Sequence, residues 1–167
     1  MKEELNIRIF NEIYEKNKKL DEVFIKKYDH AELIKKNKLE LLVEIGELAN
    51  ETRCFKYWSK KEVNHDLVGF ELADCFIMTL CFFNTLNIDL EEKFYNDLDG
   101  DVIDMFFNIY SLTIEFIKNN NRDVLKKLFV SLINLGHNLG FKDDEIISYC
   151  TRKIDKDLER LNDEKTS

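Results

Sequence analysis

The sequence predicts an all-α protein, and three observations support this prediction. The chain of 167 residues contains no Pro and only five Gly, so the residues that punctuate β-turns are scarce. Apolar side chains recur at three- and four-residue spacing in several stretches, which is the period of helices that bury one face. Short polar runs separate these stretches, as expected for long helices joined by short loops.

Length and composition are those of a globular protein with one domain, residues 1–167. The composition is 44% hydrophobic and 35% charged, which is typical of a folded rather than a disordered chain. A domain of this length buries roughly 68–70% of its unfolded surface, so its fold needs no covalent staples.

The first predicted helix covers residues 4–28. Two polar residues interrupt its apolar side, because Asn17 lies on that side and Asp21 follows one turn later. Such a pair either forms an internal hydrogen bond or belongs to the wall of a pocket, and the sequence leaves both interpretations open. The apolar residues at helical spacing are Phe10, Ile13, Leu20 and Phe24.

The second predicted helix, residues 39–52, follows a polar connector at 29–37. Glu44 and Glu47 stand three residues apart, so their carboxylates lie side by side on one face of this helix. Apolar residues flank the acidic face on both sides.

A second acidic pair lies in the most apolar stretch of the chain, the predicted buried helix at 66–86. Glu71 and Asp74 are the only charged residues from Glu71 to Phe83. A helix that is apolar on nearly every side is buried, and unpaired charge inside a protein is costly. These acids are therefore expected to be protonated, paired or bound to a cation.

The two acidic pairs together predict a metal site. If their helices pack against each other, the carboxylates of Glu44, Glu47, Glu71 and Asp74 converge. Hard oxygen ligands that converge in this way suit Mg²⁺ or Mn²⁺.

An aromatic and basic connector, residues 53–61, joins the two acidic helices. It holds the single Trp of the chain, Trp58, near Lys56. Loops on a rigid scaffold often carry binding residues, and a Trp among cations can stack on a base and hold phosphate. Alternatively, Trp58 fills a gap between two helices beside a solvated run of charges.

Three more helices are predicted at 101–118, 122–139 and 143–162. The acidic run at 89–101 is expected to be loop. Within it, residues 97–101 are expected to form a solvated turn, because the Gly is misplaced and the terminal Glu is missing for a calcium-binding EF-hand loop.

The last predicted helix carries the one clustered basic face of the chain. Such a face could cradle a polyphosphate. It could equally be an exposed face with local ion pairs to neighbouring acids. Its residues, at three- and four-residue spacing, are Tyr149, Arg152, Lys153, Lys156 and Arg160.

Charge and cysteine usage exclude several classes of protein. A formal net charge of −8 argues against binding duplex nucleic acid or an anionic membrane. The four Cys form no C-x-x-C motif, so we expect a reducing, cytoplasmic location. We also expect no signal peptide and no membrane span. Nucleotide-binding glycine motifs are absent, and a single Glu62-x-x-His65 argues against a di-iron bundle.

The two acidic pairs and their spacer resemble a known family, the dimeric all-α dUTP diphosphatases. These belong to the wider MazG-like nucleoside triphosphate pyrophosphohydrolases. The shared pattern is E-x-x-E, a spacer, then E-x-x-D, and it is complete here, with Phe55-Lys-Tyr-Trp-Ser59 in the spacer. The resemblance implies a helical bundle of the MazG-like, dimeric dUTPase type.

Both ends of the chain extend the resemblance. The segment from Asn17 to Asp21 resembles the family's first helix, where Gln usually stands at the position of Asn17. The segment from Tyr149 to Arg160 resembles the family's basic C-terminal segment, in which Asn is common at the places held here by Ile154 and Asp157.

The resemblance implies Mg²⁺-dependent hydrolysis of dUTP, and of dUDP, to dUMP by a homodimer. Glu44, Glu47, Glu71 and Asp74 are then metal ligands, and Glu47 is our choice for the base that activates water. The implied substrate-binding residues are Asn17, Asp21, Lys56, Trp58, Lys153 and Arg160. Two alternatives are a MazG-like enzyme for another nucleotide, such as dCTP or a non-canonical NTP, and a non-enzymatic helical interaction protein.

Overall fold

A computed structural model describes residues 3–96 and 100–166. Six α-helices account for most of these residues, and the all-α prediction is confirmed. The described part also contains one 3₁₀ turn, Arg8–Phe10, and a short antiparallel pair of strands, β1 (Glu3–Leu5) and β2 (Phe94–Asn96). The helices are α1 (Asn11–Lys27), α2 (His30–Thr52), α3 (His65–Thr85), α4 (Val102–Asn119), α5 (Arg122–Asn138) and α6 (Asp143–Thr166).

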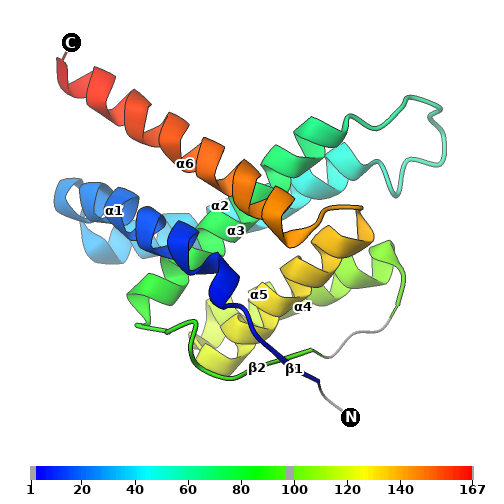
Figure 1. Cartoon of the computed structure of the whole chain (residues 1–167), viewed down its shortest axis with the longest axis horizontal. Helices are drawn as coiled ribbons and strands as arrows, with labels where there is room; N and C mark the ends of the chain where they lie inside the picture. Colours follow the sequence, from blue (N-terminus) through cyan, green and yellow to red (C-terminus); the bar gives the residue numbers. More distant parts are fainter. Residues whose placement is uncertain (1–2, 97–99, 167) are drawn as a thin grey trace.

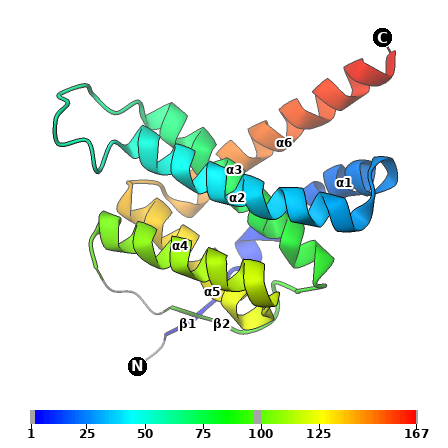
Figure 2. The same cartoon turned by 180° about the vertical axis from the view of Figure 1, so that it is seen from behind.

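Helix α3 lies at the centre of the arrangement. It contacts α1, α2, α5 and α6, and Figures 1 and 2 show it passing between them. Its side chains are buried on most sides, as the nearly uncharged sequence of this helix predicts. The acidic pair of α3 is therefore held on the most enclosed element of the fold.

A cluster of phenylalanine rings joins the elements beneath α3. Phe129 of α5 contacts the rings of Phe10, Phe76, Phe83 and Phe94, with ring centroids 5.1–6.5 Å apart. Burial of each ring contributes about 1.5–3 kcal/mol to stability. This cluster fixes α3 against α5 and against the β2 segment.

The prediction of a polar connector at 29–37 is wrong, because α2 begins at His30. The Asp29 side chain accepts a hydrogen bond from the backbone N–H of Glu32, which caps the helix. Residues 30–38 contain no Gly or Pro, and several of them line a pocket. Their polarity reflects a partly exposed helix and not a loop.

Two other predicted segments, the first helix and the acidic loop, also differ in part from the structure. Residues 3–5, at the start of the predicted first helix, form β1, and residues 94–96, predicted as loop, form β2. Leu5 is paired with the buried Phe94 across the two strands. Of the predicted turn at 97–101, residues 97–99 lie outside the described part of the chain.

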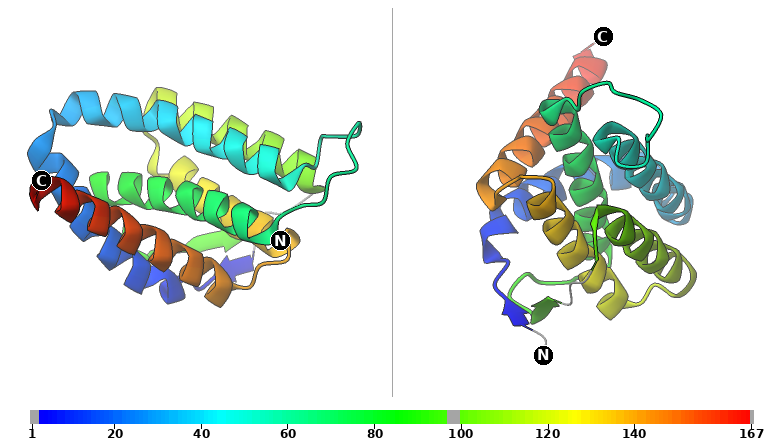
Figure 3. Two further views of the ribbon diagram at one scale, coloured as in Figure 1. Left: turned by 90° about the horizontal axis from the view of Figure 1, so that it is seen from above. Right: turned by 90° about the vertical axis from the view of Figure 1, so that its right-hand side faces the viewer.

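The connector Arg53–Asn64 projects from one end of the α2–α3 pair (Figure 3). The turn between α1 and α2 lies at the other end. No helix among the described residues is long and apolar enough to cross a membrane.

Candidate metal centre and adjoining pocket

Three carboxylates meet where α2 packs against α3. One oxygen from each of Glu44, Glu47 and Glu71 lies within 4.8 Å of the corresponding oxygens of the other two. The three-residue spacing on α2 puts Glu44 and Glu47 on one face, and the α2–α3 contact brings Glu71 opposite them. Three of the four acids predicted to converge therefore do so, and we call Glu44, Glu47 and Glu71 the carboxylate cluster.

Asp74, the fourth predicted ligand, lies beside the cluster and faces α6. Its carboxylate forms an ion pair with Lys153, with 3.4 Å between Oδ1 and Nζ. Burial raises the pKa of Asp74 to about 6, although the positive charge of Lys153 acts in the opposite direction. Lys153 thus compensates part of the negative charge at this end of the site.

The cluster contains buried oxygen atoms that lack partners. Oε2 of Glu44 and Oε2 of Glu71 are buried without a hydrogen bond to any described residue. Burial raises the pKa of both carboxyl groups well above their ordinary values, and the nearby charges of Asp74 and Glu47 raise them further. The arrangement is unfavourable unless it takes up protons or a cation.

The cluster fits a divalent cation of the hard type. Glu44, Glu47 and Glu71 offer only carboxylate oxygens, the donors that Mg²⁺ and Mn²⁺ prefer. Two oxygens of these residues are buried without a partner, and a bound cation would compensate the cost of burying them. Asp74, next to the cluster, can complete the set if Lys153 moves to the substrate.

A pocket adjoins the cluster between α1, α2, α3 and α6. It is a cavity of about 640 Å³, within the size range of small-molecule sites. Glu40 lines it about one helical turn before Glu44 on α2, and Ile77 lines it about one turn after Asp74 on α3. A ligand in this pocket therefore has the carboxylate cluster as its neighbour.

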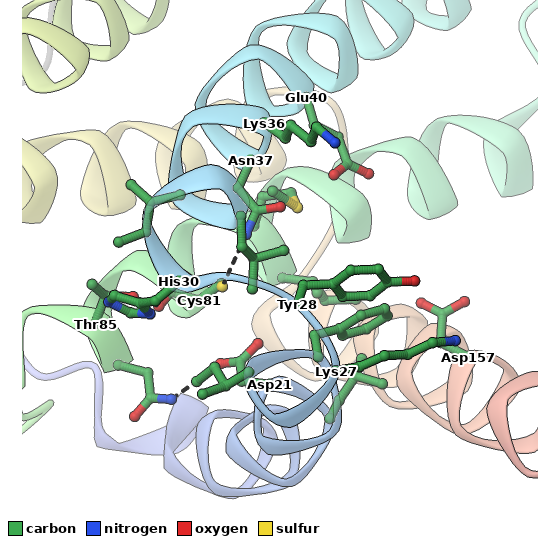
Figure 4. A pocket seen from close by; sticks show the side chains of 18 of the residues that line it. Asp21, Lys27, Tyr28, His30, Lys36, Asn37, Glu40, Cys81, Thr85 and Asp157 are labelled. Carbon is green, nitrogen blue, oxygen red and sulfur yellow. Dashed lines mark hydrogen bonds between the residues drawn. The ribbon is translucent and has the colours of Figure 1, made fainter.

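Figure 4 shows the inner wall of this pocket. Asp21 of α1 is 7% exposed and accepts a hydrogen bond from Nδ2 of Asn84 on α3, at 3.3 Å. Burial raises the pKa of Asp21 to about 6, and the contact with Asn84 partly opposes that shift. Nδ2 of Asn37 lies 3.8 Å from Sγ of Cys81, so amide, thiol and carboxyl groups share the wall.

A comparison with protein families identifies the chain. A family model described as dUTPase matches residues 9–164, which is nearly the whole sequence. The chain belongs to the dUTPase family. The family is that of the all-α dUTP diphosphatases, so the protein is a hydrolase whose substrate is a nucleotide. A search of curated proteins found no match.

Family membership argues against one of the alternatives that the sequence left open. It favours dUTP hydrolysis over a non-enzymatic interaction protein. The E-x-x-E and E-x-x-D pairs that carried the resemblance lie on the facing helices α2 and α3, as that interpretation requires.

Among the residues predicted to bind the dUTPase substrate, Asp21 and Arg160 line the pocket. Arg160 of α6 forms an ion pair with Asp157 at 2.7 Å. Asn17 does not line it. Its side chain is fully buried, with Nδ2 donating to the carbonyl of Ile77 at 3.1 Å and Oδ1 without a partner among the described residues.

Lys56 and Trp58 lie on the connector, away from the pocket. Trp58 is 64% exposed and contacts the rings of Phe55 and Tyr57, while Lys56 lies over the Phe55 ring. The pocket is lined from the first half of α2 and the second half of α3, whereas the connector joins their other ends. Trp58 is therefore remote from the pocket in this arrangement.

Sequence reasoning missed the polar groups that α2 and α3 contribute to the pocket. Asn84 and Cys81 fall at the end of an apolar helix, and Asn37 falls in the segment predicted as a connector. A helical period extended back to Asp29, an N-cap residue with Glu32 three positions later, would have placed Asn37 on the helix.

Proposed function

We propose that this protein hydrolyses dUTP, and also dUDP, to dUMP in a reaction that depends on Mg²⁺. The observation that carries the proposal is the pair of buried, unpartnered oxygens on Glu44 and Glu71 beside Glu47. A triphosphate is repelled by an acidic site unless a cation reverses the local charge. The family match supports dUTP as the nucleotide.

Glu44, Glu71 and Asp74 are proposed to hold the metal, together with Glu47. When bound, the ion neutralises phosphate oxygens and makes a nearby water more acidic. The packing of α2 against α3 supports this proposal, because it holds the carboxylates of the two helices close to one another. Mn²⁺ would satisfy the same oxygen donors.

Glu47 is proposed as the base. It is the exposed member of the cluster, so water reaches it, whereas Glu44 and Glu71 are more enclosed. A carboxylate in this position can accept the proton of the attacking water.

Basic residues from two directions are proposed to bind the phosphates. Lys153 forms an ion pair with Asp74 beside the carboxylate cluster. Arg160 lines the pocket and forms an ion pair with Asp157. Lys56, on the connector with Trp58, would approach from beyond the cluster as seen from the pocket. Positive charge near the leaving phosphates stabilises the negative charge that builds up there.

Asp21 is proposed to contact the nucleoside directly, whereas Asn17 supports the pocket from behind. The buried contact from Asn17 to the Ile77 carbonyl ties α1 to α3. Since Ile77 lines the pocket, this contact positions one of its walls.

The substitution Glu47→Gln tests the mechanism. It keeps the size and polarity of the side chain but removes its basicity, so we expect dUTP turnover to fall by about 10²–10⁴-fold. Pyrophosphate release with Mg²⁺ measures activity, and thermal unfolding checks the fold. Glu115→Gln, on the exposed side of α4, is the matched control. Near-normal turnover by Glu47→Gln would remove Glu47 from the mechanism.

A nucleotide panel tests the substrate. We expect dUTP to be turned over faster than dCTP, dTTP and the ribonucleotides, and dUDP to be hydrolysed as well. Faster turnover of dCTP or of a damaged nucleotide would assign the chain to a different MazG-like activity. If the protein shows no turnover of any nucleotide and no thermal shift with Mg²⁺, both proposals are contradicted.

The proposed enzyme is a homodimer, and two helices offer a face for it. Helices α2 and α4 pack side by side, with the Tyr110 hydroxyl against Gly46 (Figure 2). Five large apolar side chains, each 40–68% exposed, lie on the outer sides of these helices. We call Leu39, Val43, Ile103, Phe107 and Ile114 the α2–α4 apolar face.

Charge favours a second copy as the occupant of this face. Two chains of net charge −8 repel each other, so they associate best where both are uncharged. The positions 39, 43, 46 and 50 on α2 carry no charge over three turns. An apolar patch of this kind on a chain that is 35% charged marks an interaction surface.

A reducing, cytoplasmic location is also part of the proposal. All four cysteines are free thiols, and Cys75 and Cys150 are buried in the core. Free, buried thiols are compatible with a compartment in which disulfides are rare.

A further inference from the structure

We propose that Asp21 and Asn84 together read the pyrimidine edge of the substrate and make the enzyme prefer uracil to cytosine. The inference rests on the proposed function, because it places the nucleoside in the pocket beside the carboxylate cluster. Asn84 has no counterpart in the motifs of the sequence, and its assignment comes from its position in the pocket wall.

The two side chains form a fixed pair across two helices. Asp21 on α1 and Asn84 on α3 are 63 positions apart in the chain, and Nδ2 of Asn84 donates to Oδ2 of Asp21 at 3.3 Å. A carboxylate can only accept hydrogen bonds, so this contact sets the orientation of the amide. Both residues line the cavity, and Figure 4 shows the Asp21 carboxylate within it.

The pair has hydrogen-bonding capacity left for a ligand. A carboxylate offers about four acceptor positions, and the amide of Asn84 uses one of its two N–H groups on Asp21. The Cys81 thiol, a weak donor, also contacts Asp21. The wall therefore presents a strong acceptor next to a free donor.

The hydrogen-bonding edge of uracil matches the Asp21 acceptor and the Asn84 donor. The edge of cytosine, placed in the same position, does not. Uracil has an N–H at ring position 3 between two carbonyl oxygens, whereas cytosine has an unprotonated nitrogen there beside an amino group. A carboxylate opposite position 3 accepts from uracil but faces the lone pair of cytosine. The free N–H of Asn84 then donates to the adjacent uracil carbonyl.

The position of the pocket prevents cytosine from escaping this mismatch. Glu40 and Ile77 line the pocket about one helical turn from Glu44 on α2 and from Asp74 on α3, so the phosphates of a nucleoside held in the pocket can reach the cluster. A base tethered in this way cannot slide by one ring position to bring its amino group to Asp21 without moving the phosphates. Sites built around such buried polar groups discriminate strongly between close analogues.

The variant Asp21→Asn tests the assignment, with kcat/KM measured for dUTP and dCTP. We expect the wild type to prefer dUTP, and Asp21→Asn to reduce the dUTP to dCTP ratio by at least about tenfold, mainly through KM. Calorimetric binding of dUMP and dCMP without metal gives a second readout that does not depend on turnover. Asp123→Asn, on the exposed first turn of α5, is the isosteric control.

The exchange variant Asp21→Asn, Asn84→Asp separates base reading from a structural role. It keeps the net charge and one carboxylate–amide pair, but it moves the carboxylate from α1 to α3. If the pair only holds the helices together, the exchange restores the dUTP preference. If the pair reads the base, the preference stays low, although thermal stability returns toward that of the wild type.

The outcomes distinguish this inference from the function on which it rests. A wild type that does not hydrolyse dUTP overturns the proposed function, and the binding of dUMP against dCMP then still tests the pocket. Equal binding of the two monophosphates by the wild type overturns the inference. An unchanged ratio of kcat/KM for dUTP to that for dCTP in Asp21→Asn also overturns the inference. Recovery of the wild-type ratio in the exchange variant does so too.

Discussion

Each buried acid of the site is costly to ionise in the folded protein, and this makes the stability of the protein depend on pH. The pKa of Glu44, Glu71 and Asp74 is raised above the ordinary value, with burial as the largest cause. In the folded protein these groups therefore hold protons at a pH where the unfolded chain has released them. Stability must then fall as pH rises through the folded pKa values.

We predict that the metal-free protein is more stable at about pH 6 than at about pH 8, by a few degrees in Tm. Asp21 contributes in the same direction, since its pKa is raised to about 6. Because a cation competes with protons for the same oxygens, Mg²⁺ should raise Tm more at the higher pH. Thermal unfolding with and without Mg²⁺ at both values measures these effects.

The variant Glu71→Gln isolates the cluster from the other acids. It should weaken the pH dependence and abolish most of the Mg²⁺ shift, whereas Glu115→Gln should change neither. A Tm that is independent of both pH and Mg²⁺ in the wild type would contradict the prediction.

At the scale of elements, α3 is held by close approaches that leave no room for added atoms. A Cβ built on Gly69 would lie 2.6 Å from the ring of Tyr149, so α3 and α6 approach within the width of a side chain there. The Tyr149 ring also packs against the ring of Phe70. The Tyr149 hydroxyl donates a hydrogen bond to Oδ1 of Asp66 at 2.5 Å. This contact fixes α6, which carries Lys153 and Arg160, relative to Glu71.

Gly69→Ala should therefore destabilise the protein by about 1–3 kcal/mol, although Ala is the better helix former. Because the clash lies two residues before Glu71, dUTP turnover should fall as well. Chemical denaturation measures stability, and Lys127→Ala on the exposed side of α5 is the control, expected within about 0.5 kcal/mol. Equal stability of Gly69→Ala and wild type would mean that α6 adjusts freely.

The sequence predicts the helices better than their ends. The buried helix at 66–86 is found at 65–85, because the period and the lack of charge are strong signals. The start of α2 was missed because His30 to Lys38 is polar, and polarity alone does not separate an exposed helix from a loop. Strands β1 and β2 pair residues about 90 positions apart, so no local pattern reveals them.

The same limit applies to the site. The three-residue spacing predicts that Glu44 lies beside Glu47. The apolar residues around both acidic pairs predict that the two helices pack together, which brings Glu71 to the other two acids. The pairing of Asp74 with Lys153 and of Asp21 with Asn84 depends on how α1, α3 and α6 pack, which spacing does not encode.

At the scale of the whole molecule, the α2–α4 apolar face predicts the oligomeric state. Phe107→Glu places a charge at the centre of this face, at a position that is 68% exposed and contributes little to the core. We expect the variant to be monomeric at concentrations where the wild type is a dimer, with an unchanged helix content. Light scattering or sedimentation measures the mass in solution.

Lys127→Glu on α5 is the control for the added negative charge, because this residue is exposed on another helix. It should leave the mass unchanged. A wild type that is monomeric at all concentrations, or a dimer that persists in Phe107→Glu, would show that this face is not the interface.

The pocket wall has a consequence for how the protein acquires its activity. One side of the cavity comes from α1 and another from α6, the first and last helices described. A nascent chain on the ribosome can thus bury much of its aromatic core while the substrate cavity still lacks a wall. Catalytic competence should therefore appear only after α6 has left the exit tunnel and docked.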